Sequence, residues 1–135
     1  MKATLLLFFT LLSTAALAQR RHPIDVAYQK CVAKDAATGD GAPGGLRACD
    51  GEALRQWNAE MARLLAKLPI QRTAQVAWVR QRDKHITEMK SGGPGGEVPM
   101  GVLDEVRGYQ IEATRLRVLE LTKLAKEQAF VIPKE

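Results

Sequence analysis

The stretch Gln75-Val-Ala-Trp-Val-Arg-Gln-Arg-Asp83 is the segment around which we expect this chain to fold. On a helix, Trp78 and Arg82 share a face, because side chains four positions apart are neighbours. A large indole beside Arg82 and Asp83 predicts that the ring is buried in a core and fixes the helix there. The charged groups would then lie at the edge of that core. We therefore expect Trp78 to be the main buried side chain of a helix from Gln71 to Lys90.

Residues 1–18 have the pattern of an export signal. Lys2 supplies the positive charge, Leu5 to Leu12 form an apolar run, and Ala16-Leu17-Ala18 is a cleavage site of small residues. We expect cleavage after Ala18, which leaves residues 19–135 as one domain that is periplasmic or secreted. A retained membrane anchor is the less favoured alternative, because a span needs about 20 apolar residues. No stable membrane span is expected after cleavage.

The charge balance is mildly basic. The chain has 20 Lys and Arg residues against 15 Asp and Glu residues, a net charge of +5, and loss of Lys2 with the leader lowers it to +4. A surplus of this size is usually a solvated surface, and it also favours an anionic partner such as peptidoglycan or a membrane surface. Nucleic acid is not an expected partner, because basic and aromatic residues do not interleave as they do in proteins that stack bases.

The two cysteines of the chain, Cys31 and Cys49, flank a break rich in glycine that ends at Gly45. In an exported protein, two cysteines in one small domain are most simply a disulfide. Closing a loop of this length stabilises the fold by about 3 kcal/mol. A nucleophilic cysteine would need a histidine and an acid beside it, and a zinc site would need four ligands, so both alternatives are less favoured.

Apolar residues at spacings of three and four predict an all-α fold. We expect a small antiparallel bundle of about four helices with one disulfide, joined at two connections rich in glycine. Asp25 is a candidate N-cap for the first helix, and the segment from Lys34 to Gly45 is expected to end it. The other helices are predicted over residues 46–68, 71–90 and 103–126.

Two of these helices have a continuous apolar stripe. In the second helix the stripe consists of Leu54, Trp57, Met61, Leu64, Leu65 and Leu68. In the last helix it consists of Val106, Tyr109, Ala113, Leu116, Leu119 and Leu124. We expect these stripes to face the core.

Three features together resemble the lysozyme inhibitor LprI-like family of exported bacterial proteins. They are the pair Cys31 and Cys49, the block Ala74-Gln75-x-Ala77-Trp78-Val79-x-x-Arg82-Asp83, and the pattern Thr114-x-x-Arg117-x-x-x-Leu121. The resemblance covers residues 28–121. It implies a helical fold and a binding or inhibitory role. The motif residues Gln75, Trp78, Arg82, Asp83, Thr114, Arg117 and Leu121 would then be mainly structural.

The chain departs from that family at two places. The family commonly has a further cysteine shortly after the Arg-Asp pair and another before the Thr-x-x-Arg pattern. Here those neighbourhoods contain His85-Ile86 and Gly108-Tyr109-Gln110. Without a second disulfide, the third and fourth helices must be joined by packing.

Arg82, Asp83 and Arg117 form a candidate charge cluster beside Trp78. In one interpretation, an arginine of this cluster contacts an anionic ligand or an acidic cleft. In the other, the three residues are a hydrogen-bonded clamp that orients two helices. The clamp is favoured, because charges beside a core tryptophan usually serve the fold.

The connection from Ser91 to Gly101 is the candidate binding loop. A protruding loop stiffened by proline can enter a concave cleft at modest entropic cost. Its candidate contact residues are Gly92, Gly93, Pro94, Gly96, Glu97, Pro99 and Met100. A plain helix connection is the alternative, and loop length favours it.

No catalytic, cofactor or metal site is predicted. The two histidines, His22 and His85, lie far apart in the sequence, and neither has the convergent partners that a general base or a metal site needs. We therefore expect no cofactor and no enzymatic activity. The resemblance implies an exported binding protein that blocks a lysozyme-like muramidase. The alternatives are a module that binds another envelope protein, and a peptidoglycan binder without inhibitory activity.

Overall fold

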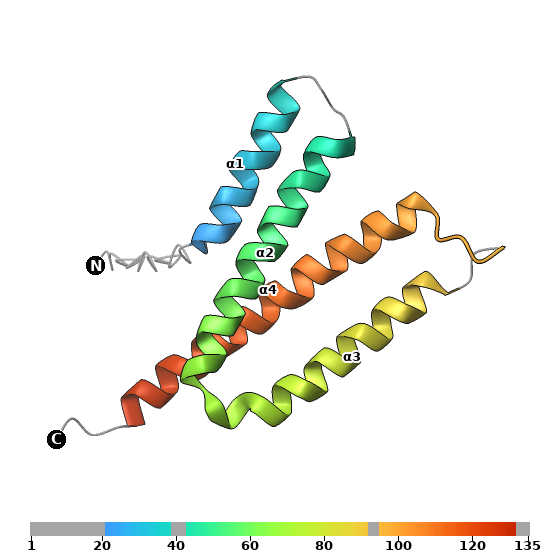
Figure 1. Ribbon diagram of the computed structural model, residues 1–135. Coiled ribbons are helices and arrows are strands. Elements are labelled where there is room, and N and C mark those ends of the chain that lie inside the picture. Colours follow the sequence, from blue (N-terminus) through green and yellow to red (C-terminus); the bar gives the residue numbers. More distant parts are fainter. Residues whose placement is uncertain (1–20, 39–42, 92–94, 132–135) are drawn as a thin grey trace, which may run out of the picture.

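The computed structural model describes residues 21–38, 43–91 and 95–131, and over these ranges the predicted all-α fold is confirmed. The elements are α1 (Pro23–Ala37), α2 (Pro43–Lys67), a short 3-10 helix η1 (Pro69–Gln71), α3 (Arg72–Lys90) and α4 (Met100–Val131) (Figure 1). The predicted leader and its cleavage site after Ala18 lie outside the described residues, as do Gly92, Gly93 and Pro94 of the candidate loop.

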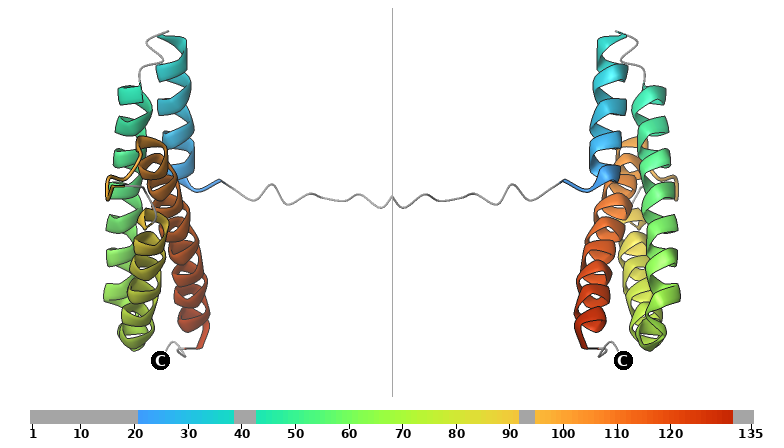
Figure 2. Two further views of the ribbon diagram at one scale, coloured as in Figure 1. Left: turned by 90° about the vertical axis from the view of Figure 1, so that its right-hand side faces the viewer. Right: turned by 90° about the vertical axis from the view of Figure 1, so that its left-hand side faces the viewer.

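The helices form two antiparallel hairpins that cross. One hairpin is α1 with α2 and the other is α3 with α4, and they meet where α2 packs across α4 (Figure 1). The contact between α2 and α4 is the most extensive of any pair of elements. Seen edge-on, α1 and α4 lie on one side of the molecule, and α2 and α3 lie on the other (Figure 2). Pro69 separates α2 from α3, because proline is not tolerated inside a helix.

The core lies where α2 and α4 cross. From α2 it takes one face of the helix, as the predicted stripe requires, and from α4 it takes two apolar residues. The buried members are Ala53, Trp57, Met61, Leu64, Leu68, Val118 and Leu121. Trp57 is the largest of them and only 1% exposed. The other two predicted stripe residues of α2, Leu54 and Leu65, are half-buried.

The predicted disulfide between Cys31 and Cys49 is confirmed, with the two Cα atoms 5.8 Å apart. It joins α1 to α2, and α1 needs such a tie because none of its residues is fully buried. The Tyr28 hydroxyl donates a hydrogen bond of 2.8 Å to Asp50 of α2. Burial and this bond to a carboxylate raise the pKa of Tyr28 to about 12.

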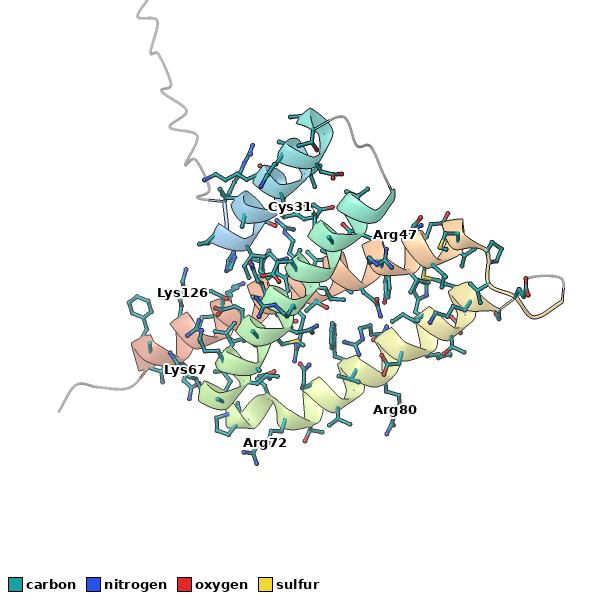
Figure 3. The ribbon with its side chains drawn as sticks, turned by 45° about the horizontal axis from the view of Figure 1, so that its top comes forward. Cys31, Arg47, Lys67, Arg72, Arg80 and Lys126 are labelled. Atoms are coloured by element: carbon teal, nitrogen blue, oxygen red, sulfur yellow. A yellow bond between two sulfur atoms is a disulfide. The ribbon has the colours of Figure 1, made fainter. Side chains whose placement is uncertain are left out.

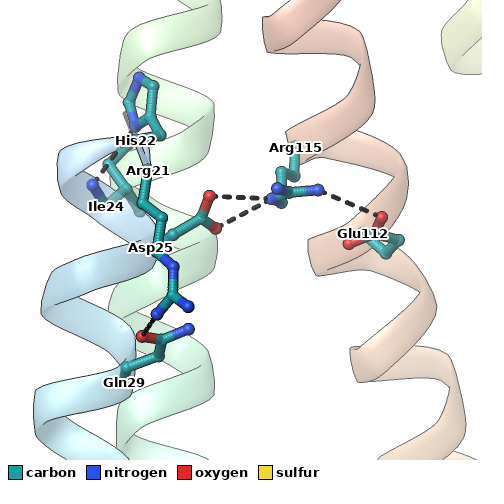
Figure 4. A network of polar contacts seen from close by, with 7 residues as sticks. All are labelled: Arg21, His22, Ile24, Asp25, Gln29, Glu112 and Arg115. Carbon is teal, nitrogen blue, oxygen red and sulfur yellow. Dashed lines mark hydrogen bonds and ion pairs between the residues drawn. The ribbon is translucent and has the colours of Figure 1, made fainter. Parts of the chain in front are cut away.

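A further tie joins α1 to α4. The Arg115 Nε donates to both carboxylate oxygens of Asp25, at 2.9 and 3.1 Å, and Arg115 Nη1 lies 3.4 Å from Glu112 (Figure 4). The suggested N-cap role of Asp25 was wrong. His22 is the N-cap, with its Nδ1 accepting from the backbone N–H of Ile24, so Asp25 falls in the first turn and is free to pair with Arg115.

Three helices extend beyond their predicted ends. α2 begins at Pro43, where the sequence predicted residue 46, because proline is accepted at the first position of a helix. α1 continues through Lys34 to Ala37, because that stretch contains no glycine or proline until Gly39. α4 begins at Met100 and reaches Val131, where the sequence predicted 103–126. Before α4, Gly95 and Gly96 adopt φ angles of 88° and 78°, a left-handed conformation that favours glycine.

The predicted apolar stripe of α4 was partly wrong. Leu116 and Leu119 are exposed, whereas the buried residues of the helix are Val106, Thr114, Arg117, Val118 and Leu121. The reason is that α4 packs against α2 on one side and α3 on another, so its covered surface is not a single narrow stripe. Thr114 is accommodated there because its hydroxyl donates to the backbone carbonyl of Gln110 at 2.7 Å.

The prediction that Trp78 is the main buried residue of α3 was also wrong. Trp78 is half-buried against the edge of the core, and Ile86 is the buried residue of that helix. The tryptophan in the core is Trp57, because α2 and not α3 crosses the centre of α4. Within the ranges described, the helices are too short or too polar to cross a membrane.

Candidate functional site

The motif residues of α3 and α4 meet at one place, and Gln75 joins them. The Arg117 Nε donates a hydrogen bond of 3.0 Å to Gln75 Oε1, which links α4 to α3. The amide nitrogen of Gln75 in turn lies 3.4 Å from the sulfur of Met61, so it also reaches α2. Gln75 therefore contacts polar or sulfur atoms of both neighbouring helices from its place on α3.

Arg117 is nearly buried, with 5% of its side chain exposed. Its Nη1 donates to Glu120 one turn further along α4, at 2.7 Å. Its Nη2 is buried and has no hydrogen-bond partner among the residues that the structure describes. A buried cation is costly unless its donors are paired, so this part of the site is under-satisfied.

Arg82 has a different environment. Its Nε and Nη2 both donate to Asp83 Oδ1, at 2.9 and 2.8 Å. Its guanidinium carbon also lies 5.0 Å from the ring centroid of Trp78, within the range of a cation–π contact. The predicted single cluster of Arg82, Asp83 and Arg117 therefore divides into two groups. The clamp between helices is made by Gln75 and Arg117, while Asp83 pairs only with its neighbour in the sequence among the described contacts.

His85 and Tyr109 provide a second link between α3 and α4. Their ring centroids are 4.6 Å apart and the planes are tilted by 57°. In the LprI-like pattern, cysteines would lie in the segments around these two residues. Here an aromatic contact joins the two segments. His85 also lies 3.9 Å from Glu88, a weak pairing at an exposed site.

Beside these contacts lies a groove of about 650 Å³ between α3 and α4, which we call the α3–α4 groove. This volume is in the range of ligand pockets. The groove combines aromatic, apolar and charged side chains of both signs. They are Trp78, Gln81, Arg82, Lys84, His85, Glu88, Tyr109, Glu112, Ala113, Leu116, Arg117 and Glu120.

The structure places the remaining candidate residues around this groove or beneath it. Thr114 and Leu121 are fully buried, so they support the helices and are not available to a partner. In the candidate loop, Gly96, Glu97 and Pro99 are exposed and Met100 is the exposed first residue of α4. Residues 95–99 lead into α4 at the end of the α3–α4 hairpin (Figure 1), and they do not line the groove.

Reasoning from the sequence missed several contacts. It did not predict that Gln75 pairs with Arg117, that Asp25 pairs with Arg115, or that Tyr28 pairs with Asp50. These pairs are 42, 90 and 22 positions apart in the sequence, and no local pattern signals them. Among the described residues, no group of three or more His, Cys, Asp and Glu side chains is placed to hold a metal ion.

Comparisons of this chain with protein-family models, with curated proteins and with solved structures return no match. The groove and the residues that line it are therefore the basis for the function proposed below.

Proposed function

We propose that this chain is an exported binding protein and that the α3–α4 groove is its contact surface for a partner protein. One observation carries the proposal: the two motifs behind the resemblance to the LprI-like family, separated in the sequence, converge on one groove through Trp78, Arg82 and Arg117. Aromatic and arginine side chains are the residue types enriched at protein interfaces, and here they lie beside an exposed leucine. In the groove, that leucine is Leu116.

The first candidate partner is a lysozyme-like muramidase, as the resemblance implies. In this proposal, the exposed end of the α3–α4 hairpin enters the enzyme cleft through Glu97, Pro99 and Met100, and the α3–α4 groove contacts the enzyme surface beside that cleft. The disulfide supports an exported location, because such bonds persist mainly in oxidising compartments such as the periplasm. The proposal includes no catalytic residue, cofactor or metal.

The test is a cell-wall lysis assay with the purified protein in excess over each of several muramidases. We expect loss of lytic activity with the wild-type protein and recovery of activity with Leu116→Glu, which places a charge in the groove. The matched control is Val76→Glu, an equally exposed apolar position on α3 that does not line the groove. Full lytic activity with excess wild-type protein would end the inhibitor proposal. Inhibition that survives Leu116→Glu would mean that the α3–α4 groove is not the surface that contacts the enzyme.

A second candidate is an interaction module that binds another envelope protein. It is favoured by an apolar hollow of about 320 Å³ at the corner between α2 and α3, lined by Leu68, Pro69, Ile70, Gln71, Leu124 and Gln128. Ile70 is 81% exposed there. This candidate predicts that Ile70→Glu, and not Leu116→Glu, abolishes co-purification of a specific envelope protein.

A peptidoglycan binder is the third candidate, and basic side chains on the surface favour it. Arg72 and Arg80 extend outward from α3, and Lys67 lies at the end of α2 (Figure 3). Attraction of exposed charges to an anionic polymer is screened by salt. This candidate therefore predicts sedimentation with insoluble wall material that weakens as salt is added, together with unchanged muramidase activity.

A further inference from the structure

Arg117 holds a buried positive charge whose hydrogen bonds are incomplete. Its Nε donates to Gln75, a neutral acceptor, and its Nη1 donates to Glu120, while its Nη2 has no partner within the described part of the chain. A guanidinium presents its donors in a planar fork that matches the two oxygens of a carboxylate. Among the described residues, one carboxylate oxygen, Glu120 Oε2, accepts from that fork.

Glu120 provides this oxygen, and its side chain is able to move away from Arg117. Glu120 lies on the surface with 58% of its side chain exposed, and it is held by one hydrogen bond to Arg117. Water competes for the exposed Glu120 carboxylate, although not for the buried Arg117, so Glu120 can exchange this hydrogen bond for hydration. Another carboxylate that reached the same edge of Arg117 could replace Glu120 and also engage Nη2.

The neighbouring groove determines what kind of carboxylate fits. Trp78, Ala113 and Leu116 offer an apolar wall next to Arg117. The charges of the groove lining balance, with Arg82, Lys84 and Arg117 against Glu88, Glu112 and Glu120, so the groove suits a ligand with one negative charge better than one with two, such as a phosphate. A ligand with one carboxylate and an aromatic or aliphatic body matches both features.

We propose that the α3–α4 groove is a carboxylate-binding site in which Arg117 is the anchor and Glu120 is a competitor built into the chain. The inference rests on the groove being a contact surface, as proposed above, and it specifies the chemistry of the partner: an acidic group beside an apolar one. Arg82 is not the anchor, because two of its donors are already bound to Asp83.

The experiment is an NMR titration of the purified protein with 3-phenylpropionate, and in parallel with its neutral amide. We expect saturable shifts of the Trp78 indole N–H and of amides in α3 and α4 with the acid, and weaker effects with the amide. Glu120→Gln removes the competitor from an exposed position, so it should increase affinity for the acid about threefold. Arg117→Lys keeps the positive charge but removes the planar guanidinium with its paired N–H donors. It should lower the affinity for the acid about tenfold.

Arg80→Gln is the matched control, at an exposed arginine of α3 that does not line the groove, and it should leave the affinity of the acid unchanged within about twofold. Equal shifts with acid and amide, no saturable binding to the Glu120→Gln protein, or an unchanged affinity in that variant would each overturn the assignment. Because Glu120→Gln alters only a surface side chain, the test does not depend on whether Arg117→Lys folds. Carboxylate binding without muramidase inhibition would refute the muramidase proposal alone and leave this assignment standing.

Discussion

The two hairpins of this protein are held together by different means. The α1–α2 hairpin has a covalent tie, Cys31–Cys49, and its second helix supplies most of the buried core. The α3–α4 hairpin has polar and aromatic ties, Gln75 with Arg117 and His85 with Tyr109, and a groove along its length. The first hairpin therefore contributes most of the buried core, while the second presents charged and aromatic groups in the groove where we propose that a partner binds.

The largest expected effect is on the free energy of unfolding, and it differs between the two tryptophans. Trp57→Ala should lower the free energy of unfolding by about 3–5 kcal/mol, because it opens a cavity in the core. Trp78→Ala should cost only about 1–2 kcal/mol, because the indole is half-buried. Urea denaturation followed by circular dichroism measures both. Equal costs, or a larger cost for Trp78→Ala, would contradict the assignment of the core to α2 and α4.

Removing the disulfide tests the covalent tie. The double variant Cys31→Ser with Cys49→Ser should lose about 3 kcal/mol, the entropic contribution of closing a loop of this length. Because no residue of α1 is fully buried, we expect its amides to exchange rapidly in hydrogen-exchange measurements while those of α2 and α4 stay protected. Uniform loss of protection across all helices would show that α1 is integral to the core.

The polar tie of the second hairpin should have an intermediate effect. Gln75→Ala leaves the buried Arg117 Nε without its acceptor and should cost about 1–3 kcal/mol. Arg82→Ala removes a surface pair with Asp83 and a cation–π contact, and should cost at most about 1 kcal/mol. Both are measured by urea denaturation. The reverse order would mean that Arg82, not Arg117, clamps the helices.

The last expected effect is a pH dependence in the first hairpin, which is confined to alkaline solution. The folded protein holds the Tyr28 proton more tightly than the unfolded chain, with a pKa of about 12 against an ordinary value of 10.0. The stabilisation is therefore fully present below pH 10 and is lost as the pH rises toward 12. The free energy of unfolding should fall less steeply over this interval in Tyr28→Phe than in the wild-type protein. Identical slopes would remove Tyr28 as the cause.

Much of the helical pattern was predictable because it is local. The stripe through Trp57, Met61 and Leu64 identified α2 and its buried face, and Pro69 marked where α2 ends. The polar site was less predictable. Arg117 was named from a motif, but nothing in its neighbourhood showed that Gln75, 42 positions away, would accept its hydrogen bond.

The sequence alone determined that this chain forms helices, roughly which segments separate them, and which two cysteines pair, because helix propensity, proline and a single pair of cysteines act independently of long-range packing. Only the tertiary structure decided which tryptophan is buried and which arginine is clamped. Both outcomes depend on the crossing of α2 over α4, which sets the face that each helix turns inward. That crossing is fixed by contacts between residues far apart in the chain, and the spacing within one helix does not encode it.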